Sequence, residues 1–163
     1  MKTTQRIGVG AAVVLRIALG AVFTFAGFYK LIRPAEYFQM VVDMYHVAPE
    51  ALVPAIAAVM PWIEFIFGFF LLVGYASRLS ARVVAVLCAM FLGILVQALV
   101  RDLPIDQCGC FGGSFHMELK NSILADSAML LVAIGLSFLR LRLPLSLDGI
   151  LKPLPADLAP TQS

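Results

Sequence analysis

The chain has 163 residues, of which 61% are hydrophobic and only 13% are charged, and its mean hydropathy is +0.95. A soluble domain is closer to half apolar and a quarter charged, so this composition excludes an ordinary soluble enzyme and predicts a protein whose outer surface faces lipid. The net charge of +2, with lysines and arginines at segment ends and no basic stripe, argues against a nucleic-acid partner.

The first long apolar segment predicts a helix over residues 7–31 that ends before Pro34, because proline disfavours a helical residue before it. No clear cleavage signal follows this segment, so we interpret it as a retained helix and not as a signal peptide. One face of the helix carries small and charged residues, which is typical of a stripe that faces the interior of a bundle: Arg16, Gly20, Phe23, Gly27 and Lys30. A polar stretch with scattered aromatics, residues 34–49, comes next.

Three further apolar segments predict helices over residues 52–75, 81–100 and 121–139, with a loop over residues 101–120. The connection between the second and third helices is short, which makes them antiparallel neighbours. The predicted fold is therefore an all-α integral membrane four-helix bundle formed by residues 1–142. The remaining residues, 143–163, are rich in proline and predict a flexible cytoplasmic tail.

Ionisable residues inside predicted spans are costly, so each is a candidate functional residue. Arg16 and Glu64 have similar predicted depths and are expected to form a salt bridge, which serves either as a structural pair or as part of a quinone pocket or proton route. A second polar layer is expected nearer the outer surface, where Lys30 either pairs with Asp126 or helps to bind a quinone; its members are Lys30, Gln97, Asn121 and Asp126. Cys88, in the apolar middle of the third helix, is interpreted as a packing residue.

The distribution of lysine and arginine predicts the orientation of the helices, because cytoplasmic ends carry the excess of these residues. The side that holds both termini and the connection between the second and third helices has that excess. We therefore expect both termini in the cytoplasm of a bacterium, the bundle in the inner membrane, and loop 101–120 on the periplasmic side, where disulfides persist.

The loop carries two thiols separated by one glycine, Cys108 and Cys110. Glycine permits the backbone angles that such close sulfur atoms need, and a disulfide in so small a ring is expected to be strained and readily reduced. Two alternatives stay open: unlinked thiols, and a metal site of Cys108, Cys110 and His116, which lacks a convincing fourth ligand. His46 and His116 are candidate bases near the cysteines.

The segment Asp106-Gln107-Cys108-Gly109-Cys110-Phe111-Gly112-Gly113 resembles the cysteine motif of the MauE/DoxX superfamily. The four-helix plan, the helix-one stripe and the segment Met60-Pro61-Trp62-Ile63-Glu64 agree with that resemblance, which spans roughly residues 10 to 140. Gln107 departs from it, since the family usually has aspartate directly before the first cysteine. The resemblance implies a membrane protein that supports disulfide formation or maintenance in periplasmic proteins with a thioredoxin-like partner, and related members are associated with quinone and thiosulfate chemistry.

Three functions follow as hypotheses. The first is a thiol-disulfide oxidoreductase with Cys108 and Cys110 as catalytic residues and quinone as a candidate cofactor. The second is a noncatalytic chaperone or anchor subunit that holds a partner redox complex through residues 34–49. The third, a small transporter of a sulfur compound, is weaker because the four short helices show no broken segments.

Overall fold

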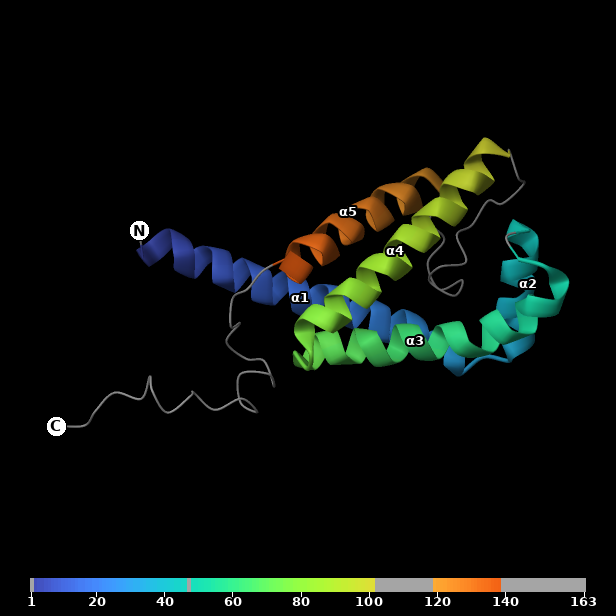
Figure 1. The fold of residues 1–163 in the computed structure, drawn as a ribbon, viewed down its shortest axis with the longest axis horizontal. Coiled ribbons are helices and arrows are strands. Elements are labelled where there is room, and N and C mark those ends of the chain that lie inside the picture. Colours follow the sequence, from blue (N-terminus) through green and yellow to red (C-terminus); the bar gives the residue numbers. More distant parts are fainter. Residues whose placement is uncertain (1, 47, 102–118, 139–163) are drawn as a thin grey trace.

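The computed structural model describes residues 2–46, 48–101 and 119–138, and the regular secondary structure of these residues consists of helices joined by turns (Figure 1). The helices follow in the order α1 (Lys2–Leu31), α2 (Ala35–Tyr45), the short 3-10 helix η1 (Glu50–Leu52), α3 (Val53–Val73), α4 (Ser77–Val100) and α5 (Leu119–Phe138). The predicted tail and the predicted cysteine loop lie outside these residues, apart from the loop's two ends.

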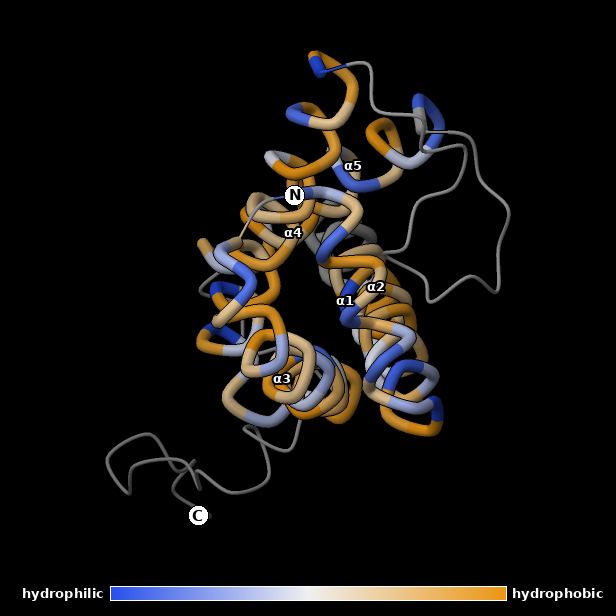
Figure 2. Tube along the Cα trace, turned by 90° about the vertical axis from the view of Figure 1, so that its right-hand side faces the viewer, coloured by the Kyte–Doolittle hydropathy of each residue, from blue (hydrophilic) through white to orange (hydrophobic). Residues whose placement is uncertain are grey.

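Four helical segments of the described chain are long and apolar enough to cross a membrane: Gly10–Leu31, Glu50–Val73, Ser77–Val100 and Lys120–Phe138. Large apolar side chains also point away from the protein, as at Val86, which is 68% exposed, and at Leu131, which is 71% exposed. Figure 2 shows the colour of hydrophobic residues along much of the length of the helices. This distribution suits a lipid environment, and the predicted all-α membrane bundle is confirmed.

Helix α1 packs along α3, and α4 packs along α5, whereas the two pairs meet over a smaller area. Glycines bring α1 and α3 close together: an added Cβ would lie 2.5 Å from the Phe65 backbone nitrogen at Gly27 and 2.5 Å from the Leu72 backbone nitrogen at Gly20. Close approach through small residues is how membrane helices gain packing energy in lipid. The predicted inward-facing stripe of α1 therefore lies against α3.

Helices α3 and α4 are joined by a tight turn in which Gly74 and Ala76 both adopt positive φ angles, 76° and 44°. Glycine adopts such angles without steric cost, and it caps α3 through a backbone bond to Phe70. Helix α4 thus begins at Ser77, earlier than the predicted residue 81. From this turn α3 and α4 diverge, and α2 lies across the wide end of the gap (Figure 1).

Helix α2 differs from the expectation of a polar stretch at residues 34–49. Its sequence places apolar side chains at positions i, i+3, i+4 and i+7, namely Phe38, Val41, Val42 and Tyr45. This spacing forms one face of an amphipathic helix, and Val42 and Tyr45 are buried. Polar residues interrupt this face in the sequence, so the segment has no continuous apolar run of membrane length.

Candidate functional site

Lys30 and Glu64 form an ion pair inside the bundle. Lys30 lies in the last turn of α1 and Glu64 near the middle of α3, and the Lys30 Nζ donates hydrogen bonds to Glu64 Oε1 at 2.7 Å and to Oε2 at 2.8 Å. The two side chains are 2% and 1% exposed. A buried charge is tolerated only when it is paired and hydrogen-bonded, so the burial of each of these two charges requires the other as its partner.

The predicted salt bridge between Arg16 and Glu64 is wrong. The glycine contacts fix an antiparallel register in which Gly27 faces Phe65 and Gly20 faces Leu72. Continuing this register places Arg16 level with the turn between α3 and α4, about 18 Å along the bundle from Glu64 at a rise of about 1.5 Å per residue. Arg16 is buried, but it lies at the end of the bundle that holds the α3–α4 turn, whereas Glu64 lies near the middle of α3.

Asp126 joins Lys30 and Glu64 from the opposite side. It lies on α5, is 3% exposed, and interacts electrostatically with Lys30. A cavity of about 20 Å³ separates its carboxyl group from Glu64. About 10 to 15 Å³ is enough for one water molecule, and within the described chain the Asp126 Oδ2 has no hydrogen-bond partner. The three ionisable residues and this space form a buried polar cluster, which we call the Lys30 cluster.

The structure therefore groups the residues of the two predicted polar layers in a different way from the prediction. Glu64 belongs with Lys30 and Asp126, and not with Arg16. Gln97 is half-buried on α4 and Asn121 is exposed on α5, and neither lines a cavity that the Lys30 cluster contributes to. Lys30 and Asp126 are thus the members of the predicted outer layer that come together. The predicted direct pairing of Lys30 with Asp126 is replaced by pairing with Glu64.

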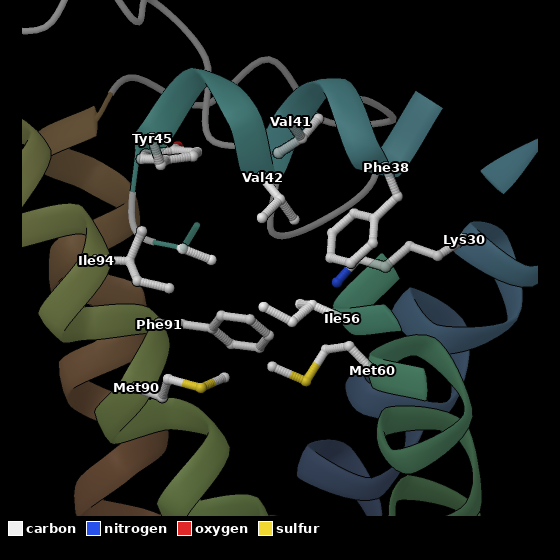
Figure 3. A pocket seen from close by; sticks show the side chains of 11 residues that line it. Lys30, Phe38, Val41, Val42, Tyr45, Ile56, Met60, Met90, Phe91 and Ile94 are labelled. Carbon is white, nitrogen blue, oxygen red and sulfur yellow. The ribbon is translucent and has the colours of Figure 1, made fainter. Parts of the chain in front are cut away.

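A larger cavity of about 260 Å³ opens above the Lys30 cluster (Figure 3). Among the described residues, its wall is apolar apart from the Lys30 ammonium group and the Tyr45 hydroxyl group. The lining residues come from four helices and the connection after α2: Lys30, Phe38, Val41, Val42, Tyr45, Ala48, Ile56, Met60, Met90, Phe91 and Ile94. We call this cavity the α2 pocket, because α2 forms its roof. Its four α2 residues are the members of the apolar face described above, so their i, i+3, i+4, i+7 spacing was the sequence signal that could have revealed them.

The cysteines fall into two groups. Cys88 is fully buried in the hydrophobic core with Leu71 and Val84, which confirms its interpretation as a packing residue. Cys108 and Cys110 lie outside the described residues, as does His116. His46 ends α2 with a positive φ angle of 51°. Among the described residues, no three histidine, cysteine, aspartate or glutamate side chains gather as metal ligands would.

Comparison with known proteins gives one match. Residues 9–140 match the family model described as methylamine utilisation protein MauE. Curated proteins and solved structures give no match. The matched region covers most of the chain and includes all four membrane-length helices, the Lys30 cluster and the segment with the two loop cysteines.

Proposed function

The chain belongs to the MauE family of methylamine utilisation membrane proteins, and from this premise we propose that it is a membrane thiol-disulfide redox protein in which Cys108 and Cys110 cycle between dithiol and disulfide. The observation that carries the proposal is that the family match includes the Cys108-Gly109-Cys110 motif. The chain has three cysteines, and the third, Cys88, is fully buried. Thiol exchange with another protein therefore falls to the loop pair.

The chemistry begins with a thiolate that attacks a disulfide sulfur and forms a mixed disulfide with the partner, which the second thiolate then resolves. The partner is a thioredoxin-like periplasmic protein or a client with its own cysteines. When the pair is oxidised from dithiol to disulfide, two electrons and two protons leave it. A membrane quinone that accepts both electrons and both protons becomes a quinol and balances the reaction.

The described bundle supports this proposal by the position of its polar residues. Helix α4 ends and α5 begins at the end of the bundle where α2 lies (Figure 1), so the loop between them is attached there. Lys30, at the end of α1, and Asp126, in the second turn of α5, belong to the same end. The excess of lysine and arginine at the opposite end supports a cytoplasmic location for that end. It therefore also supports a loop that faces the periplasm of a bacterial inner membrane.

The proposal predicts that the loop pair changes redox state in membranes. Full-length protein in membrane vesicles is treated with a thiol-alkylating reagent that adds mass before and after oxidised quinone is supplied. We expect quinone to protect two thiols in the wild type, because a disulfide cannot be alkylated. The variants Cys108→Ser and Cys110→Ser each retain one reactive thiol and are expected to abolish client oxidation.

Cys88→Ala is the matched control, since it removes the buried thiol and leaves the loop pair. It is expected to retain the quinone-dependent protection of two thiols. Two results together contradict the redox function: the loop thiols remain open to alkylation under every condition, and the double serine variant oxidises clients normally.

A second candidate function is a noncatalytic anchor for a partner redox complex. Its support is the outer face of α2, where Tyr37, Met40 and Met44 are 60%, 66% and 51% exposed. Apolar side chains of this kind suit a partner protein or the membrane interface. The anchor function predicts that the double serine variant supports full client maturation and that charged residues at Met40 and Met44 abolish it.

A further inference from the structure

We propose that the α2 pocket binds the ring of a membrane quinone, with one carbonyl oxygen of the ring accepting a hydrogen bond from Lys30 Nζ. This inference rests on the proposed function for the source of the electrons, but the binding itself is independent of the cysteines. It assigns a ligand role to α2, whose apolar face has no other described function.

The first argument is the donor that Lys30 offers. An ammonium group has three hydrogens, and Glu64 accepts two of them. Figure 3 shows the Lys30 nitrogen at the edge of the α2 pocket beneath Phe38. The nitrogen lies 4.9 Å from the ring centroid of Phe38 and 5.1 Å from that of Phe91. The ammonium group therefore lies between two aromatic rings, at the edge of a space lined mainly by apolar side chains.

The second argument is the size and chemistry of the space. An apolar cavity of about 150 Å³ accepts a benzene molecule, so about 260 Å³ accommodates a substituted six-membered ring. Met60 and Met90 line the side opposite α2, and flexible thioether side chains adapt well to the faces of aromatic ligands (Figure 3). A ring fills this space with apolar contacts on both faces.

The third argument excludes other occupants. A phosphate group would leave most of its oxygens without donors, because Lys30 is the one charged residue that the described part of the chain contributes to the wall. A lipid acyl chain would satisfy the apolar wall but would offer no hydrogen-bond acceptor to the Lys30 ammonium group. A neutral ring with a carbonyl oxygen at its edge satisfies both the wall and the donor, and among such molecules a quinone is the two-electron acceptor that a dithiol needs.

The fourth argument is access. Helices α3 and α4 diverge from their connecting turn (Figure 1), and the pocket is lined by residues of both helices far from that turn, such as Ile56 and Ile94. Met90, in the α4 wall, is 37% exposed, so the pocket borders the surface that lipid covers. A quinone dissolved in the bilayer can enter from the side, beneath α2.

The test uses full-length protein in lipid nanodiscs and a short-chain ubiquinone with a photoreactive azido group on its ring. Labelled peptides are mapped by mass spectrometry, with unlabelled ubiquinone as competitor. We expect saturable labelling of α2 and of the pocket side of α4. Ile56→Trp fills the pocket from α3 and is expected to lower labelling about tenfold or more, which corresponds to the loss of about 1.4 kcal/mol of binding.

Val59→Trp is the matched control, because it adds the same side chain to the same helix at a position that is 55% exposed and does not line the pocket. It is expected to leave labelling within about twofold of the wild type. Ile94→Trp repeats the blocking experiment from α4, with the exposed Val96 changed to tryptophan as its control. If thermal unfolding shows that Ile56→Trp does not fold, this second pair of variants still tests whether the quinone binds in the α2 pocket.

The variant Cys108→Ser/Cys110→Ser separates this inference from the proposed function. We expect it to bind the quinone as the wild type does while losing all thiol exchange. Three results overturn the pocket assignment: labelling is not saturable, it falls equally with Ile56→Trp and Val59→Trp, or an unreactive phospholipid abolishes it as well as ubiquinone does. Thiol exchange that persists in that case leaves the proposed function intact with a different electron acceptor.

Discussion

Replacing Lys30 with methionine is expected to destabilise the bundle by about 3 to 5 kcal/mol, because Glu64 is then a buried charge without its partner. The double variant Lys30→Met/Glu64→Leu is expected to recover part of that loss, since an apolar pair of similar volume removes the desolvation cost of both charges, while the buried Asp126 still lacks the lysine. The measurement is the midpoint of thermal unfolding of the purified protein in detergent, compared with the wild type.

The two single variants are expected to differ. Glu64→Leu leaves Lys30 with Asp126, with which it already interacts, and a lysine at a helix end can extend toward the membrane surface. Glu64 lies near the middle of α3 and has no such route, so Lys30→Met is the more damaging change. Two results would show that the pair is not coupled as the structure indicates. Either the two single variants lose the same amount of stability, or the double variant is no more stable than Lys30→Met.

Replacing Gly27 with alanine is the second change with a large expected effect. The added Cβ would lie 2.5 Å from the Phe65 nitrogen and 2.8 Å from its Cα. Backbone atoms of a packed helix cannot move aside cheaply, so α1 and α3 must separate, at a cost of about 1 to 3 kcal/mol. Because Lys30 follows on the next turn, the separation also pulls its ammonium group away from Glu64. A lower unfolding midpoint is the expected readout.

Gly93→Ala is the matched control for this change. Gly93 lies within α4, and a Cβ added there meets no atom within 4 Å. Alanine is the better helix former by about 1 kcal/mol, so the control is expected to be neutral or slightly stabilising. If Gly27→Ala and Gly93→Ala shift the unfolding midpoint alike, the close approach of α1 and α3 does not limit stability.

The sequence predicted the membrane-length helices with bounds that differ from the structure by a few residues. Helix α1 begins at Lys2 where residue 7 was expected, and α4 begins at Ser77 where residue 81 was expected. The apolar runs gave the number of spans correctly, because length and hydropathy are local properties. The helices also include polar residues that flank these runs, because a helix can extend beyond the apolar segment that crosses the membrane.

The partner of Glu64 could not be found in the same way. The predicted depth of an ionisable residue depends on where its own apolar segment ends, and each residue of error at that end shifts the depth by about 1.5 Å. The contacts of Gly20 and Gly27 set the true register between α1 and α3. That register pairs Glu64 with Lys30 and places Arg16 at the far end.

By itself, the sequence determined that this chain resides in a membrane, which of its residues are costly to bury, and that a thiol pair lies between its last two helices. Composition, apolar length and the spacing of two cysteines are properties of the chain that folding does not change. Only the tertiary structure decided that Lys30, Glu64 and Asp126 meet, and that α2 roofs a pocket beside them. These features depend on the register between helices and on how α3 and α4 diverge, and both are set by packing between residues far apart in the chain.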